Sequence, residues 1–170
     1  WMSVAALSAG CISKGTAGGG LGSGAGAPMQ GFRVAPMKKV RVGMIGVGAR
    51  GTGAVRRIAQ IPGCEVTALS DINPKRLDEN LAWLKEHGYR APDEWSRNGN
   101  EEAWKGLCDS DVCDVVYSAT PRPLHAPINV YAMDHGKHVL QEVPGAFSIE
   151  ECWATVEAAE RNRRHCMMLE

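Results

Sequence analysis

The sequence predicts an α/β protein built on a doubly wound parallel sheet. Three observations indicate this fold. Apolar segments of strand type alternate with amphipathic helical segments from Lys38 onward, a glycine-rich turn follows the first of these strands, and an acidic residue ends the second. Such alternation is typical of β-α-β units, whose right-handed connections place helices on both faces of one sheet. Ligands of such sheets bind at the carboxyl ends of the strands.

The first expected strand, residues 39–45, runs into Gly46, Gly48 and Gly51, which fit the spacing G-x-G-x-x-G. The first glycine permits a tight turn, the second lets the backbone approach a pyrophosphate, and the third lets the helix pack closely on the strand. The following helix would direct its free N–H groups and positive dipole end at that phosphate. A glycine-rich surface turn is the alternative, since the chain has 20 glycines. The strand before and the helix after favour a dinucleotide site.

The second expected strand, residues 64–70, ends at Asp71, which lies 20 residues beyond Gly51. A carboxylate in this position would accept hydrogen bonds from the hydroxyls of the adenosine ribose. The same negative charge would repel the 2′-phosphate of NADP, and positions 72 and 73 hold no arginine that could accommodate it. We therefore predict NAD as the cofactor.

The later elements follow from apolar periodicity and from the residues that begin and end helices. They are a helix from Asn73-Pro74 closed by Gly88, an irregular loop over 90–100, a short helix over 101–107, a strand over 114–119, a helix over 126–135 capped by Gly136, a strand over 137–141, a helix opened by Ser148 and Glu151, and a strand from 165. The last helix carries an apolar stripe of Ile149, Cys152, Trp153, Val156 and Ala159. Trp83, Trp104 and Trp153 are expected in the core.

Two segments at the expected carboxyl edge of the sheet carry further candidate residues. His125 ends the loop that begins at Thr120, and it would either contact the nicotinamide end of the cofactor or cap the next helix. Glu142 follows a strand and precedes Val143-Pro144, so we interpret it as a contact of the nicotinamide ribose.

The composition excludes several classes of site. Acidic and basic residues balance at 19 each, so no overall field would attract nucleic acid. The six cysteines form no C-x-x-C pair and no zinc spacing, and those inside predicted elements would behave as small apolar residues. We therefore expect no metal site and no disulfide framework.

Residues 1–37 do not have the pattern of folded protein. Residues 4–11 resemble the end of a secretory signal, and the ending at Cys11 resembles a lipobox whose cysteine would be lipidated, anchoring an exported protein to a membrane. An arbitrary start within a low-complexity leader is the alternative. Residues 15–27 have the composition of a flexible linker. The chain ends inside an expected strand, so residues 38–170 are interpreted as the nucleotide-binding part of a longer protein.

Taken together, these features resemble the N-terminal Rossmann domain of the Gfo/Idh/MocA oxidoreductases. They are the three glycines with Asp71, the Thr120-Pro121-x-x-x-His125 loop, the segment 136–139 and Glu142-x-Pro144. The resemblance implies that an α+β substrate domain follows. Dehydrogenases of this superfamily have a lysine near the reacting hydroxyl where this chain has Val143, and an isopropyl group can neither donate nor accept a proton.

The Glu-Val-Pro version, with segments 131–139 and 168–170, is similar to glycoside hydrolase family 109. Members hydrolyse α-N-acetylgalactosaminides with a tightly held NAD. The resemblance implies cofactor contacts from Ala49, Arg50, Asp71, His125, Glu142 and Val143, and at Arg122, where the family usually has tryptophan. The residues that bind the sugar and transfer protons would lie beyond residue 170.

The resemblance also implies a reaction. A hydride leaves C3 of the sugar, the C2 proton and the glycosidic oxygen are lost, water adds, and the hydride returns. This needs no flanking pair of carboxylates, unlike most glycosidases. The alternatives are an NAD-dependent sugar or polyol dehydrogenase and a non-catalytic NAD-binding domain. Any of these would bind small molecules, and the exposed edge of the sheet could support a homo-oligomer.

Overall fold

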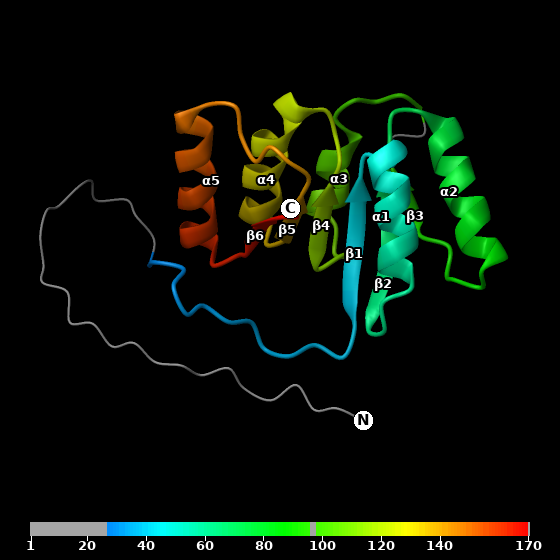
Figure 1. Cartoon of the computed structure of the whole chain (residues 1–170), viewed down its shortest axis with the longest axis horizontal. Coiled ribbons are helices and arrows are strands. Elements are labelled where there is room, and N and C mark those ends of the chain that lie inside the picture. The colour runs from blue at the N-terminus through cyan, green and yellow to red at the C-terminus, as the bar shows by residue number, and fades with distance from the viewer. Residues whose placement is uncertain (1–26, 96–97, 170) are drawn as a thin grey trace, which may run out of the picture.

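The computed structural model describes residues 27–95 and 98–169 and confirms the doubly wound parallel sheet (Figure 1). Six parallel strands lie in the order β3-β2-β1-β4-β5-β6. Their bounds are β1 Val40–Ile45, β2 Cys64–Ser70, β3 Asp93–Trp95, β4 Val115–Ser118, β5 His138–Gln141 and β6 Cys166–Met168. The strand order reverses between β1 and β4, which is the point where doubly wound sheets bind their ligands.

Helices cover both faces of this sheet. Their bounds are α1 Ala49–Ala59, α2 Pro74–Glu86, α3 Ala103–Asp109, α4 His125–Asp134 and α5 Ile149–Asn162, with a 3₁₀ turn at Arg122–Leu124 (η1). One apolar cluster joins α1 and α2 to β1 and β2, and a second joins α3, α4 and α5 to β4 and β5. Successive strand residues point to opposite faces, so Val116 packs under α4 whereas Tyr117 packs under α1.

The predicted start and end of α2 and the predicted start of α5 are confirmed, whereas the short helix expected over 101–107 lies at Ala103–Asp109. The Asn73 side chain accepts a hydrogen bond from the N–H of Lys75 at 3.1 Å, and Gly88 ends that helix at φ +75°. Ser148 Oγ accepts from the N–H of Glu151 at 3.1 Å. The Glu151 carboxylate in turn accepts from the N–H of Phe147 at 2.6 Å, one residue before the N-cap.

The irregular loop predicted over 90–100 is wrong in part. Residues Asp93–Trp95 form β3, which pairs in parallel with β2. Two acidic residues and only three positions give this strand almost no β pattern, so the sequence alone favours a loop. Tertiary packing stabilises the strand. The Trp95 ring lies so close to Gly106 on α3 that a Cβ at Gly106 would come within 2.7 Å of the ring.

The expectation that Trp153 belongs to the core is also wrong. Trp153 is 62% exposed, and its neighbours Ile149 and Val156 on the predicted stripe are 72% and 45% exposed. Cys152 is exposed as well, whereas Trp104 is buried and Trp83 is half-buried. Ala159 is the buried member of the predicted stripe, and together with Ala158 it forms the buried side of α5, where small side chains let this helix lie close to α4.

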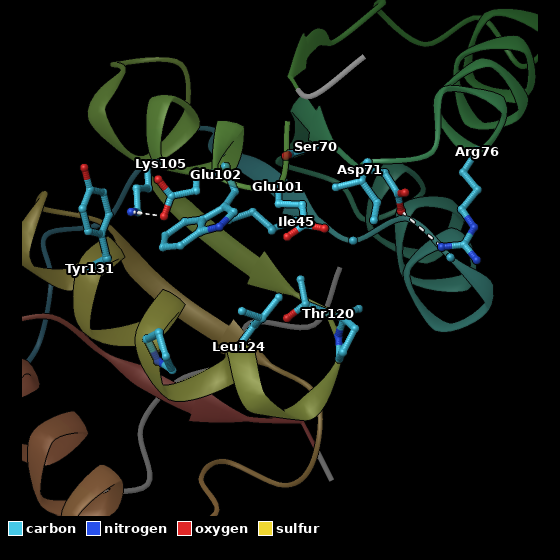
Figure 2. A pocket seen from close by; sticks show the side chains of 17 residues that line it. Ile45, Ser70, Asp71, Arg76, Glu101, Glu102, Lys105, Thr120, Leu124 and Tyr131 are labelled. Carbon is cyan, nitrogen blue, oxygen red and sulfur yellow. Dashed lines mark hydrogen bonds and ion pairs between the residues drawn. The ribbon is translucent and has the colours of Figure 1, made fainter. Parts of the chain in front are cut away.

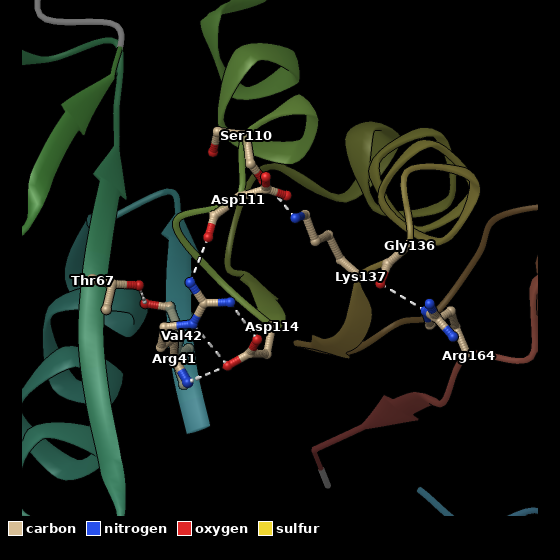
Figure 3. A network of polar contacts seen from close by, with 9 residues as sticks. All are labelled: Arg41, Val42, Thr67, Ser110, Asp111, Asp114, Gly136, Lys137 and Arg164. Atoms are coloured by element: carbon tan, nitrogen blue, oxygen red, sulfur yellow. Dashed lines mark hydrogen bonds and ion pairs between the residues drawn. The ribbon is translucent and has the colours of Figure 1, made fainter. Parts of the chain in front are cut away.

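Polar contacts join the amino end of the sheet (Figure 3). The Arg41 guanidinium donates to both carboxylate oxygens of Asp114, with Nη2–Oδ1 at 2.6 Å and Nε–Oδ2 at 3.1 Å, and to the Asp111 carbonyl. This bidentate contact lowers the pKa of the Asp114 carboxyl, and burial opposes it only in part. Lys137 donates to the Ser110 carbonyl, and Arg164 donates to the Gly136 carbonyl. These hydrogen bonds join the loops that precede the amino ends of the strands.

The described part of the predicted leader and linker contacts the folded domain. Arg163 donates to the carbonyls of Ala27 and Pro28 at 2.8 and 3.0 Å, and its guanidinium lies 4.4 Å from the centroid of the Phe32 ring. Cys11 and nearly all of the glycine-rich segment lie outside the described residues. Within residues 27–95 and 98–169, no helix is both long and apolar enough to cross a bilayer.

Candidate functional site

The glycine turn after β1 has a geometry that larger residues would disrupt. Gly46 has φ +82°, and a Cβ added there would lie 2.7 Å from the Ala119 carbonyl oxygen at the end of β4. A Cβ added at Gly51 would lie 2.0 Å from the Gly46 carbonyl oxygen. The turn therefore brings the start of α1 against the carboxyl ends of β1 and β4, as the spacing predicts.

The amino end of α1 is open toward this edge. Gly48 is the N-cap and, having no side chain, makes no capping hydrogen bond to the first turn. Ala49 and Arg50 follow and are exposed. The N–H groups of the first turn and the positive end of the helix dipole can bind an anion such as a pyrophosphate.

Asp71 lies buried beside this turn at the end of β2. Its Oδ2 accepts a hydrogen bond from the N–H of Val47 at 2.9 Å, and its Oδ1 accepts from the N–H of Asn73 at 2.8 Å. The guanidinium of Arg76 lies 3.8 Å from Oδ2. The carboxylate predicted to bind a ribose is thus held in place by two backbone groups.

A cavity of about 610 Å³ opens between these elements (Figure 2). Gly46, Gly48 and Asp71 line it on one side and Thr120 and Pro121 on another. Its volume lies within the roughly 300–1,000 Å³ that is usual for small-molecule sites. The outer wall comes from residues that sequence reasoning did not assign to a site: Ile72, Arg76, Glu101, Glu102, Trp104, Lys105, Leu124, Pro127 and Tyr131.

Arg76 and Trp104 show how far the sequence could have predicted this part of the cavity wall. Arg76 lies in the first turn of α2, three residues after the N-cap Asn73, so its approach to Asp71 follows from the predicted helix start. Trp104 was assigned to the core and is buried there, but its indole also lines the cavity. Helical periodicity predicts which face of α3 is buried. It does not predict that a cavity lies between this face and the neighbouring loops.

His125 connects the two loops that follow β4 and β5. Its ring is 1% exposed, with Nδ1 2.7 Å from the Pro144 carbonyl oxygen and Nε2 2.9 Å from the Thr120 carbonyl oxygen. Both ring nitrogens are therefore engaged by backbone carbonyls. In this arrangement the imidazole holds the Thr120 loop against the turn that contains Glu142.

Glu142 lies buried at the end of β5. Its Oε1 accepts a hydrogen bond from the Tyr117 hydroxyl at 2.5 Å. Burial raises the pKa of Tyr117, and the hydrogen bond and charge of Glu142 raise it further. Val143 follows half-buried, and Arg122 is exposed on η1.

The predicted residues therefore divide into two groups. Gly46, Gly48 and Asp71 line the cavity. Seven others lie outside its lining: Ala49, Arg50 and Gly51 on α1, Arg122 and His125 after β4, and Glu142 and Val143 after β5. All of them follow the carboxyl ends of β1, β2, β4 and β5, so the candidate site is one edge of the sheet.

The described residues offer no metal-binding group of three or more His, Cys, Asp or Glu side chains. The five described cysteines are free. Burial raises the pKa of Cys108 to about 12 and that of Cys166 to about 11, so both thiols stay protonated at neutral pH.

Comparison with known proteins begins with families. A family model described as an oxidoreductase family with an NAD-binding Rossmann fold matches residues 40–170. That match spans the whole of the sheet described above.

Among curated proteins, the chain is 47% identical over 134 residues to "Glycosyl hydrolase family 109 protein 1" of Bacteroides thetaiotaomicron. This alignment covers 79% of the chain and 28% of that relative. It is 43% identical over 135 residues to the "Alpha-N-acetylgalactosaminidase" of Bacteroides fragilis, which covers 79% of the chain and 31% of the relative. The chain thus spans about a third or less of the length of these relatives.

Solved structures share the fold. The scyllo-inositol dehydrogenase of Lactobacillus casei, with bound NAD(H) and scyllo-inositol, superposes with a TM-score of 0.66 at 22% identity. The superposition covers 77% of this chain and 36% of the dehydrogenase. At this identity the likeness concerns the architecture.

Proposed function

The chain belongs to the Gfo/Idh/MocA oxidoreductase family, whose domain is an NAD-binding Rossmann fold, and we propose that it binds NAD within an enzyme that hydrolyses α-N-acetylgalactosaminides. The single observation that carries the cofactor assignment is the glycine turn. A Cβ at Gly46 or Gly51 would collide with backbone, so glycine at both positions lets the turn place the amino end of α1 at the carboxyl end of β1, where a pyrophosphate would bind.

Each part of the edge has a distinct task in this proposal. The N–H groups of Ala49 and Arg50 hold the pyrophosphate, and the Asp71 carboxylate accepts hydrogen bonds from the adenosine ribose. The cavity has the size to receive the adenine, and Ile72 and Trp104 give part of its wall an apolar surface. Glu142, at the end of β5, contacts the other ribose.

The bound nicotinamide would supply a reversible hydride acceptor for C3 of the sugar, which allows elimination and rehydration with no net oxidation. In this proposal the residues of this chain bind and orient the NAD cofactor. Val143 can neither donate nor accept a proton, and this chain covers only 28% and 31% of the relatives named as glycosidases, so we place the acid and base groups of the reaction in the remainder of the enzyme.

A hydrolase is favoured over a dehydrogenase by the residue at 143 and by the relatives. The lysine of the related dehydrogenases is replaced here by valine, and the curated relatives of 40–47% identity carry the names of glycosidases. An NAD-dependent sugar or polyol dehydrogenase is the second candidate, because some of the solved structures that share this fold are dehydrogenases with a bound nicotinamide cofactor.

One assay separates the two. The enzyme that contains this chain is incubated with nitrophenyl α-N-acetylgalactosaminide without added NAD. Nitrophenol release with no accumulation of NADH supports the hydrolase. NADH accumulation with free sugars, and no nitrophenol release, supports the dehydrogenase and contradicts the proposal.

The cofactor assignment is tested separately by calorimetry of this chain with NAD. Saturable binding that Gly51→Val abolishes supports it, provided that circular dichroism shows the variant to be folded. Absence of heat with the wild-type chain would overturn the assignment.

A further inference from the structure

Tyr117 and Glu142 come from adjacent strands and meet on the α1 side of the sheet. Tyr117 is paired in register with Leu140 across β4 and β5, and both side chains pack in the cluster formed with α1. Because side chains alternate along a strand, Glu142 points to the same face as Leu140, one step nearer the carboxyl edge. The tyrosine ring therefore lies along this face with its hydroxyl directed toward the edge where the ligand binds.

The contact between them is short and shielded from water. The Tyr117 hydroxyl is 2.5 Å from Glu142 Oε1, and the two residues are only 4% and 9% exposed. A hydroxyl that donates to a carboxylate makes a stronger hydrogen bond than a neutral pair does. The charge of Arg57 on α1 opposes the rise in the pKa of Tyr117 only in part, because burial and Glu142 have the larger effects.

We infer that Tyr117 is a positioning residue that holds the Glu142 carboxylate by Oε1 in the orientation in which it meets the cofactor. The inference rests on the proposed NAD site. A glutamate side chain has three rotatable bonds, and fixing one oxygen removes most of that freedom before the ligand arrives. A carboxylate fixed in advance binds a hydroxyl group more tightly than a mobile one, because less entropy is lost on binding.

The main alternative is that Tyr117 only fills the core. Its ring packs with Val47, Val55 and Ile58, and phenylalanine would preserve that packing while removing the donor. A purely structural residue would therefore leave NAD affinity unchanged in Tyr117→Phe. A positioning residue would lower it, and the loss would require Glu142.

The experiment is a double-mutant cycle on the affinity of the full chain for NAD, measured by calorimetry. Tyr117→Phe should weaken binding about tenfold, the worth of one hydrogen bond to a charged group. Glu142→Gln should weaken it at least as much. The double variant should bind no more weakly than Glu142→Gln alone, because Tyr117 acts through Glu142. Tyr89→Phe, at the half-buried tyrosine beside Trp83, is the matched control and should bind like wild type.

The measured affinities distinguish a positioning role of Tyr117 from a purely structural one. Unchanged NAD affinity in Tyr117→Phe, or losses that simply add in the double variant, would overturn the inference while the proposed function stands. A wild-type chain that binds no NAD would instead overturn the proposed function and with it this role for Tyr117.

A second variant covers the case in which Tyr117→Phe does not fold. Glu142→Asp keeps the charge but is one methylene too short to reach the tyrosine hydroxyl. It should lose about tenfold in affinity, and wild-type affinity in this variant would overturn the inference.

Discussion

The Asp71 carboxylate accepts a hydrogen bond from the backbone N–H of Val47, with 2.9 Å between the nitrogen and Oδ2. Val47 lies between the first two glycines of the turn, so the end of β2 fixes the loop that follows β1. Oδ1 accepts from the N–H of Asn73 at 2.8 Å, which ties the same carboxylate to the start of α2. Asp71 therefore shapes the site in addition to the ribose contact proposed for it.

Asp71→Ala should weaken NAD binding by at least about tenfold, because the ribose loses an acceptor and the Val47 N–H loses its partner. It should also lower the free energy of unfolding by about 1–3 kcal/mol. Asp71→Asn keeps one oxygen acceptor and should lose less on both scales. Calorimetry and urea unfolding measure the two effects. Wild-type affinity in Asp71→Ala would remove Asp71 from the site.

Sequence reasoning located this edge of the sheet but not its walls. The spacing of the glycines and the distance to Asp71 are local signals of backbone geometry, and the structure places them together as expected. The cavity wall formed by Arg76, Trp104 and Tyr131 depends on how α2, α3 and α4 pack against the loops. The apolar periodicity of a single segment contains no information about a cavity that forms between other segments of the fold.

Arg76 weakens the electrostatic preference for NAD over NADP. Positions 72 and 73 hold no arginine, yet the Arg76 guanidinium lies 3.8 Å from Asp71 Oδ2, where it offsets part of the negative charge. NAD should still bind more tightly than NADP. Arg76→Ala should widen that preference by up to about fivefold, the range of a half-exposed ion pair. The ratio of the two dissociation constants measures this, with Lys75→Ala as the control. An unchanged ratio would contradict a role for Arg76.

Gly51→Ala should destabilise the fold, because its Cβ would lie 2.0 Å from a backbone oxygen that cannot rotate away. The expected loss in free energy of unfolding is about 3 kcal/mol, at the upper end of overpacking. Gly53→Ala is the matched control in the same helix, since its Cβ would meet only the flexible Arg57 side chain at 3.3 Å. That variant should be neutral or more stable by up to about 1 kcal/mol. Equal stability of the two variants would contradict the close packing proposed for Gly51.

The Arg41–Asp114 contact predicts a dependence of stability on pH. The hydrogen bond from Arg41 lowers the pKa of Asp114 in the folded state. A lowered pKa means that the contribution is complete above the unfolded carboxyl pKa of about 4 and is lost as the pH falls through the lower folded value. Asp114→Asn should therefore lose about 1–3 kcal/mol at pH 7 and clearly less near pH 3.

Urea unfolding at both pH values checks this. Lys75→Ala removes an exposed pair to Glu79 at 3.9 Å and should change stability by no more than about 0.5 kcal/mol at either pH. A loss in Asp114→Asn that is the same at pH 3 and pH 7 would show that the contact contributes no charge-dependent stability.

The stripe on α5 shows a second limit of sequence reasoning. Its period correctly predicts a helix, and Ser148 correctly predicts where that helix begins. The period cannot identify which residues of the stripe another element covers, and here α4 packs on Ala158 and Ala159 while Ile149, Trp153 and Val156 stay exposed. Apolar residues at helical spacing therefore indicate a face that another surface can cover, and not always the core of the same domain.

The exposed stripe predicts self-association of this chain. Ile149, Trp153 and Val156 lie on one face of α5, Phe147 just before this helix is 58% exposed, and Met168, 51% exposed, lines a hollow together with Val156. Contiguous apolar surface of this kind favours contact between copies. Sedimentation velocity should show concentration-dependent association that Trp153→Lys reduces by at least about tenfold in affinity, with little change in thermal stability because the indole packs on little. Ile61→Lys, at an exposed apolar residue just after α1, should associate like wild type. Association that Trp153→Lys leaves intact would place the contact on another surface and contradict the role proposed for the stripe.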